Sequence, residues 1–271
     1  MIDPSGNKMD KSVILVSNDD GVQAKGIREL AMAMAPLGEV VVVAPASDQS
    51  AVSHAMSLRR PLRVERLADV ATSHGPIALY AVDGTPTDSV YMAAHHILKN
   101  RKIALVVSGI NHGANLGSDI LYSGTVSAAM EGIFLGIQGI AFSLVANHNL
   151  DFSEASRFAH ALCKSVLKNP LPSGTLLNVN VPKVIARPGF SVTSVGDHEY
   201  TNVVQERLDP RGHSYFWIGG EWNGFKDLPG TDCKAIAEGA ISVSPVEVKL
   251  TNEKLMPWLS ELPIDGYHYL S

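Results

Sequence analysis

Two adjacent carboxylates, Asp19 and Asp20, stand between an apolar run at residues 13–16 and Gly21. Neighbouring carboxylates at the end of a buried strand repel each other and lose hydration, and a cation bound beside them commonly offsets that cost. A surface turn is the alternative, because Asp-Asp-Gly is favourable turn chemistry without any ligand. The adjacent aspartates alone favour the surface turn, so the prediction of a metal site depends on the other polar loops.

Further polar loops follow apolar runs at residues 46–50, 83–88 and 108–115. In an open α/β sheet, ligands bind beyond the carboxyl ends of the strands, where such loops meet. Ser50 and Asn111 would there add neutral oxygen donors to the two carboxylates, and an all-oxygen set suits a hard divalent cation. We therefore expect one Mg²⁺ or Mn²⁺ per subunit, held by Asp19, Asp20, Ser50 and Asn111.

A phosphate group is the second ligand that the sequence predicts. Ser123, Gly124 and Thr125 precede a predicted helix and could present backbone N–H groups and hydroxyls to a phosphate, with Asn111 nearby. The alternative is an N-cap, in which the hydroxyls satisfy the same N–H groups without a ligand. The glycines spaced through residues 109–124 favour the phosphate, because glycine allows a ligand to approach the backbone closely.

Three histidines in polar loops, His54, His112 and His198, could donate a proton to a leaving group, although a structural role is the simpler interpretation of each. The pair His95–His96 lies in a predicted helix, where a core or surface role is expected.

Composition excludes several classes of function. A formal charge of -5 and a pI near 6.0 argue against binding to duplex nucleic acid, which needs clustered Lys and Arg. Two cysteines cannot form the disulfide framework of small secreted proteins, and no apolar run is long enough to span a membrane, so we expect a cytoplasmic protein without membrane contact. The nucleotide-binding motifs G-x-x-x-x-G-K-[ST] and G-x-G-x-x-G are absent, as are H-E-x-x-H and G-x-S-x-G.

The elements that must position these residues alternate between strand and helix. Apolar runs predict strands at 13–16, 40–44, 77–82, 103–107, 140–145 and 176–181, and helical spacing predicts helices at 27–37, 88–99, 125–135 and 154–167. Such alternation is typical of a Rossmann-like, doubly wound and mostly parallel α/β sheet. We expect this core to occupy residues 12–185, with residues 1–11 as an extension ahead of it. Residues 186–271 are expected to form a β-hairpin or extended arm, a strand at 241–248, and a short helix and tail at 256–271.

Six sequence blocks in this order resemble the SurE (survival protein E) family, from Val13 to at least Gly219. They read SNDDG at 17–21, VAP with QS at 43–50, GTPTD at 84–88, SGIN at 108–111, YSGTV at 122–126 and DPRG at 209–212. Two positions depart from the usual family pattern: Ala51 stands where Gly is usual, which affects the loop around Ser50, and Ser89 stands where many members have Cys.

The resemblance implies a metal-dependent nucleotidase that hydrolyses nucleoside 5′- and 3′-monophosphates, and in some members short polyphosphate. It assigns the metal ligands to Asp19, Asp20, Ser50 and Asn111, the same residues that the loops indicate. It also implies that residues 186–271 contain a protruding β-hairpin and an exchanged C-terminal segment that serves oligomerisation, and hence a homodimer or homotetramer.

Direct attack of water on phosphorus, with Asn18 orienting the phosphate or the water, is the mechanism we expect. A nucleophilic role for Asp19 or Asp20 is the alternative. Two other classes of function stay open: a nucleotide-binding module without turnover, and an oligomeric scaffold built on the aromatic segment Tyr215–Trp217.

Overall fold

The computed structural model describes residues 12–146, 150–200, 203–219, 222–265 and 269–270. The predicted extension at residues 1–11 lies outside these ranges. No helix in the described ranges is both long and apolar enough to cross a membrane.

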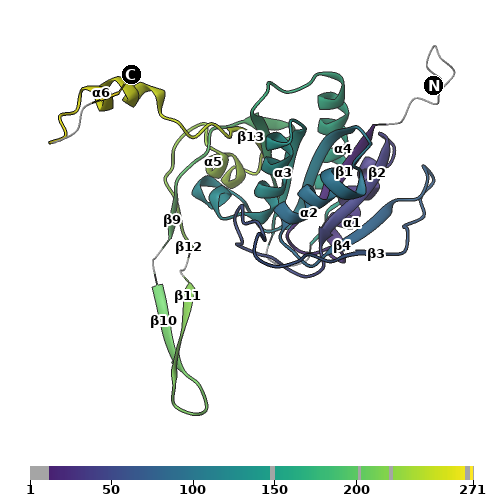
Figure 1. The fold of residues 1–271 in the computed structure, drawn as a ribbon, viewed down its shortest axis with the longest axis horizontal. Coiled ribbons are helices and arrows are strands. Elements are labelled where there is room, and N and C mark those ends of the chain that lie inside the picture. Colours follow the sequence, from purple (N-terminus) through teal and green to yellow (C-terminus); the bar gives the residue numbers. More distant parts are fainter. Residues whose placement is uncertain (1–11, 147–149, 201–202, 220–221, 266–268, 271) are drawn as a thin grey trace.

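A nine-stranded sheet forms the centre of the described chain (Figure 1). Its parallel strands are, in sheet order, β4 (Ala78–Val82), β2 (Glu39–Pro45), β1 (Val13–Ser17), β5 (Ile103–His112), β6 (Gln138–Val145) and β7 (Thr175–Pro182). Ranked along the chain they run 3-2-1-4-5-6, the doubly wound order whose direction reverses between β1 and β5. The predicted α/β class and mostly parallel sheet are confirmed.

The edges of the sheet are mixed. β3 (Val64–Arg66) pairs antiparallel with β4, and β13 (Ile241–Glu247) pairs antiparallel with β7. β8 (Phe190–Val192) lies parallel to β13 at the far edge. The region expected to be an appendage therefore supplies strands to the same sheet as the core.

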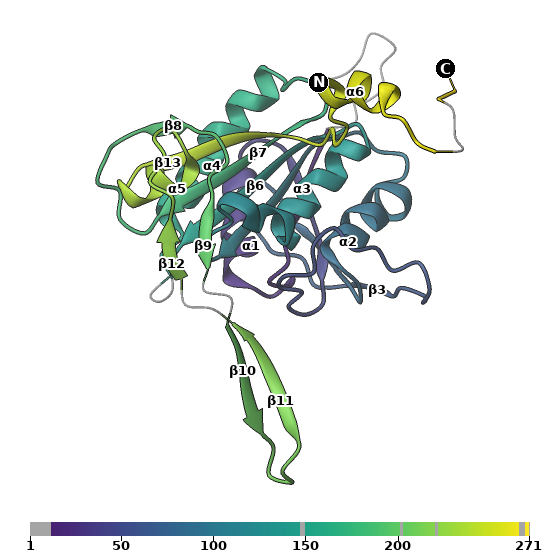
Figure 2. The same ribbon diagram turned by 90° about the vertical axis from the view of Figure 1, so that its left-hand side faces the viewer.

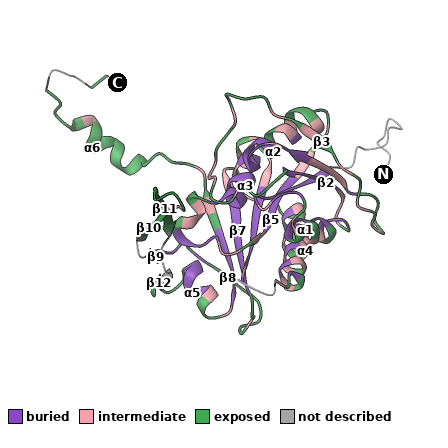
Figure 3. Cartoon of the chain, turned by 90° about the horizontal axis from the view of Figure 1, so that it is seen from below, coloured by how far each residue is buried: buried purple, intermediate pink, exposed green. Residues whose placement is uncertain are grey.

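Helices cover both faces of the sheet (Figures 1 and 2). On one face lie α1 (Lys25–Met34) and α4 (Ser153–Lys168), which share a core with Ile14 and Val16 of β1. On the other lie α2 (Pro86–Met92) and α3 (Gly124–Phe134), packed over Val13 and Leu15. Alternate residues of one strand thus enter opposite cores, as the strand period requires. Figure 3 shows these central strands as buried.

Two elements differ from the predicted bounds in ways that matter. The helix expected at 88–99 begins earlier, as α2, and continues as a π-helical turn, Ala93–Ile97. β5 runs on to His112, past a break in register between Ser108 and Asn111, so Asn111 belongs to a strand end and not to a loop. The short 3-10 helix Gly117–Leu121 and α5 (Asp232–Ala237) were not predicted, because neither is long enough to show a hydrophobic period.

A hairpin arm projects from the body (Figures 1 and 2). β10 (Val203–Leu208) and β11 (Ser214–Gly219) pair antiparallel, and β9 (His198–Tyr200) pairs with β12 (Trp222–Phe225) at its base. After β13 the chain forms a 3-10 turn, Glu253–Leu255, and α6 (Met256–Glu261), which lie away from the sheet and are exposed (Figure 3). The predicted protruding hairpin is therefore present.

Candidate metal centre

The two aspartates lie where the strand order reverses, directly after β1. Asn18 and Asp19 are buried and Asp20 is partly exposed. Asn18 Nδ2 donates to the carbonyl of Gly21 at 2.9 Å, which shapes the turn, and Gly21 has the left-handed φ of 96° that glycine adopts readily. The crevice at this reversal is where open α/β sheets bind ligands.

Asp19 is held from two directions. The Thr125 hydroxyl donates to Asp19 Oδ1, and the Gln49 amide donates to the Asp19 carbonyl at 2.8 Å. Gly124 packs so closely that a Cβ there would lie 2.7 Å from Asp19 Cβ. Burial, reinforced by the charge of Asp20 and opposed by the Thr125 hydrogen bond, raises the pKa of Asp19 from 3.8 to about 6. Such a carboxylate favours a partner that carries positive charge.

Asp20 faces the end of β5. The His112 amide donates to Asp20 Oδ2 at 3.2 Å, and His112 Nδ1 lies 4.0 Å from Asp20 Oδ1. Burial raises the pKa of Asp20, and the charge of Asp48 adds to that rise, whereas His112 opposes it. Asp48 therefore belongs to the electrostatic surroundings of this pair.

The two neutral donors approach from different elements. Asn111 precedes His112 in β5, and its Nδ2 donates to the Gly113 carbonyl at 3.1 Å, which directs the amide and leaves Oδ1 as the acceptor. Ser50 is exposed in the loop after β2, and both its amide and its hydroxyl donate to Asp48 Oδ1, at 2.7 and 2.6 Å. All four predicted ligands thus lie on chain segments that meet around Asp19 and Asp20.

The donor set fits a hard cation. Within the described residues, no group of three or more His, Cys, Asp or Glu could hold a metal, so an ion here would be held by the carboxylate pair and neutral oxygens. The buried Asn18 Oδ1 also has no hydrogen-bond partner among the described residues. Carboxylate and amide oxygens with raised carboxylate pKa values are suited to Mg²⁺ or Mn²⁺.

The predicted phosphate-binding hydroxyls both have partners within the chain. Ser123 caps α3, because its Oγ accepts from the Val126 amide at 3.1 Å, which is the alternative considered from the sequence. Thr125 donates to Asp19, and Gly124 packs against that residue. The first amides of an α-helix have no partners within the helix, so the start of α3 offers backbone N–H groups more than hydroxyls.

The three histidines have different surroundings. His54 Nε2 lies 3.0 Å from Glu131 Oε2, so its side chain contacts α3 and not the carboxylate pair. His112 lies beside Asp20, and its ring packs 5.3 Å from that of Phe152. His198 lies in β9, and its side chain is outside the described part of the structure.

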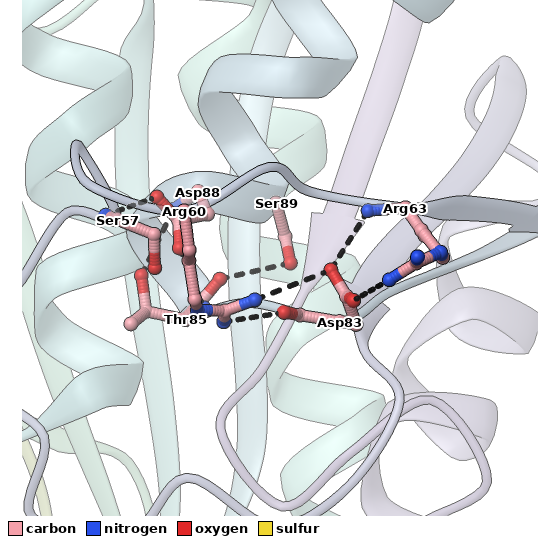
Figure 4. A network of polar contacts seen from close by, with 7 residues as sticks. All are labelled: Ser57, Arg60, Arg63, Asp83, Thr85, Asp88 and Ser89. Atoms are coloured by element: carbon pink, nitrogen blue, oxygen red, sulfur yellow. Dashed lines mark hydrogen bonds and ion pairs between the residues drawn. The ribbon is translucent and has the colours of Figure 1, made fainter.

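A polar network joins the loop that carries Ser50 to the start of α2 (Figure 4). Thr85 and Asp88 form a capping box, and Asp88 Oδ1 also accepts from the Ser57 amide at 2.9 Å. Asp83 accepts from the Arg63 amide at 2.7 Å and pairs with Arg60. The Ser89 hydroxyl is buried and donates to the Thr85 carbonyl.

Two features around the centre were not predicted from the sequence: Asp48, and the contact between His54 and Glu131. Asp48 could have been found, since Asp followed two residues later by Ser is a common turn signal. His54 and Glu131 are 77 positions apart in the sequence, and no local pattern indicates their contact.

Comparisons with known proteins agree over most of the chain. The profile of the family described as Survival protein SurE matches residues 14–202. A protein named 5′-nucleotidase SurE from Myxococcus xanthus (strain DK1622) is 50% identical over 256 residues, which cover 94% of this chain and 95% of that protein. Another of the same name from Vibrio cholerae serotype O1 (strain M66-2) is 45% identical over 260 residues, covering 93% and 94%. The crystal structure of the SurE protein from Aquifex aeolicus is similar with a TM-score of 0.77 at 39% identity, covering 92% of this chain and 98% of that one.

Proposed function

Because the chain belongs to the SurE family, we propose that it is a metal-dependent 5′-nucleotidase that hydrolyses nucleoside monophosphates to nucleoside and phosphate. The names of its relatives support the 5′-nucleotidase activity. Action on nucleoside 3′-monophosphates and on short polyphosphate is part of the proposal. The observation that carries it is the carboxylate pair at the reversal of strand order, in which Asp19 is buried, Asp20 is partly exposed and both pKa values are raised.

Asp19, Asp20, Ser50 Oγ and Asn111 Oδ1 would hold one Mg²⁺ or Mn²⁺, which when bound supplies positive charge to a phosphoryl oxygen and to water. Thr125 keeps Asp19 in place by its hydrogen bond. Asn18, buried beside the pair, would help to orient the phosphate or the attacking water.

The start of α3 supports binding of the phosphate. Gly124 brings the helix start against Asp19, so its amides and its partial positive charge act where the phosphate must lie. His112 is the histidine near the carboxylates and would donate the proton to the leaving oxygen. His54, whose Nε2 is engaged by Glu131, is a poorer candidate for that step.

Assembly into a homodimer or homotetramer, through the arm and the exchanged C-terminal segment, completes the proposal. Phe216, Trp217 and Ile218 of the arm and Trp258 and Leu259 of α6 are all more than half exposed. A two-stranded hairpin is marginally stable alone, and large exposed apolar side chains favour contact with another copy of the chain.

Phosphate release is the test. Metal-free protein would be assayed with nucleoside 5′- and 3′-monophosphates, sugar phosphates and short polyphosphate, before and after addition of Mn²⁺ or Mg²⁺, beside Asp19→Asn. We expect metal to restore release from nucleotides in the wild type and not in the variant. Folded protein that binds nucleotides but releases no phosphate with either metal would point to a binding module instead. Rapid-quench trapping of a phosphoryl-enzyme would favour an aspartate nucleophile over direct attack by water.

A further inference from the structure

Ser50 is the predicted ligand with the least local support. It lies in the segment 46–58, here called the Ser50 loop, whereas Asp19 and Asn111 lie at strand ends. Ala51 and Ser53 have φ values of 56° and 57°, a region that residues with a Cβ rarely adopt. Contacts with the rest of the protein must therefore hold the loop in this shape.

The loop is fastened on both sides of Ser50. Before it, the Gln49 amide donates to the Asp19 carbonyl at 2.8 Å. After it, the Ser53 amide donates to the Tyr122 carbonyl at 3.0 Å, and the Ser53 hydroxyl donates to the Leu121 carbonyl at 2.7 Å. The second set of contacts leads to the segment that enters α3.

The side chain of His54 extends this attachment onto α3. Glu131 is buried, and His54 Nε2 lies 3.0 Å from its Oε2. An ionised carboxylate only accepts hydrogen bonds, so this contact is a hydrogen bond in the imidazole form that carries a proton on Nε2. The His54 ring also stacks on Phe134, with centroids 5.4 Å apart and planes 27° apart. A buried carboxylate that loses its donor is strongly disfavoured, so this contact resists opening.

The same helix holds Asp19 through Thr125. Helix α3 therefore makes two contacts. Near its start Thr125 holds the predicted metal ligand Asp19, and further along Glu131 holds the loop that carries Ser50. We infer that the pair His54–Glu131 is a clasp that positions Ser50 relative to Asp19, so that His54 is a positioning residue for metal binding. The inference rests on the proposed function, because it assumes that Ser50 binds the metal.

Mn²⁺ affinity, measured on the full chain by electron paramagnetic resonance, tests the clasp without reference to turnover. His54→Asn and His54→Gln differ by one methylene, and the amide of Gln can place an N–H donor close to the position of Nε2. We expect His54→Asn to weaken Mn²⁺ binding about tenfold, the lower range for loss of a group that supports a metal ligand. His54→Gln should recover most of the affinity. Glu131→Gln keeps the shape of the side chain and removes its charge, and it should also weaken Mn²⁺ binding.

His160→Leu is the matched control. His160 is another half-buried histidine, whose Nδ1 lies 2.9 Å from the Ala33 carbonyl between α4 and α1, on the opposite face of the sheet. This variant should lower the melting temperature and leave Mn²⁺ affinity unchanged.

A double-mutant cycle shows whether the effect passes through Ser50. In a Ser50→Ala background, His54→Asn should weaken Mn²⁺ binding no further. An equal loss in both backgrounds, or wild-type affinity in His54→Asn, overturns the clasp while metal-dependent nucleotidase activity of the wild type stands. Wild-type protein that binds no Mn²⁺ overturns the metal centre and the clasp together.

Discussion

Replacing Asp19 by asparagine should make the metal-free protein more stable at neutral pH while it removes metal binding. Asparagine has nearly the shape of aspartate, and its Oδ1 can still accept the hydrogen bond from Thr125. The change therefore removes a buried charge and little else. Asp19, although required for the proposed activity, is therefore expected to lower the stability of the folded protein when no metal is present.

The pKa of Asp19 sets the magnitude and the pH range. In the unfolded chain the carboxyl ionises near 3.8, whereas in the folded protein burial raises its pKa to about 6. Well below pH 3.8, at about pH 3, both states are protonated and the residue has almost no effect on stability. As the pH rises from about 3.8 to about 6, the unfolded chain loses this proton while the folded state keeps it, so stability falls by about 3 kcal/mol in total and changes little above that range. For a chain of this size that corresponds to roughly 5–10 °C in the melting temperature.

Thermal unfolding in the presence of a chelator measures the effect, as the difference in melting temperature between variant and wild type at about pH 3 and about pH 7. We expect the two proteins to melt together at the lower pH and the variant to melt higher at pH 7. Added Mn²⁺ should raise the melting temperature of the wild type only. Asp151→Asn is the control of opposite sign, because hydrogen bonds from Ser153 lower the pKa of that exposed carboxyl. An Asp19→Asn protein that melts lower at pH 7, or a difference that does not change with pH, would refute the reasoning.

Three further results are expected. Gly124→Ala places a Cβ 2.7 Å from Asp19 Cβ, so it should lower the nucleotidase rate at saturating Mn²⁺ about tenfold or more, while circular dichroism stays that of the wild type. Thr125→Val removes the hydrogen bond that lowers the pKa of Asp19, so protons should compete with Mn²⁺ up to a higher pH in a binding titration, and Thr125→Ser should restore the wild-type pH dependence. Replacing residues 203–219 by a short flexible linker removes Phe216, Trp217 and Ile218, and the particle mass measured by light scattering should fall while the unfolding transition of the core persists.

The parallel sheet could be predicted from the sequence because its strands are buried on both faces. Runs such as residues 40–44 are apolar throughout, and a helical pattern separates most of these runs from the next, although none lies between 40–44 and 77–82. The far end of β5 could not be predicted in this way. Residues 108–112 are polar or glycine apart from Ile110, and the strand continues there because it pairs with β6 after a break in register. The end of β5 depends on pairing with β6, and such pairing between distant segments leaves no pattern in the local sequence.

The candidate site follows the same division. Asp19 and Asp20 could be singled out because they are adjacent and follow a strand, and the order of the sheet then brings Asn111 near them. The partner of a side chain is harder to predict. Ser123 and Thr125 have types and positions suited to a phosphate, yet one caps α3 and the other donates to Asp19. The approach of α3 to the end of β1 decides this, and that approach depends on Gly124.

The charges around Asp19 give a physical reason for the proposal that α3 serves both the metal ligands and the phosphate. Two ionised aspartates would repel a phosphate dianion, so substrate can approach only when positive charge balances them. A divalent cation would neutralise the pair, but the substrate then brings a further two negative charges. The amides at the start of α3 and the His112 side chain beside Asp20 are the groups available to balance part of that charge. Removing the metal should therefore weaken substrate binding strongly. Removing any single phosphate contact should weaken metal binding less.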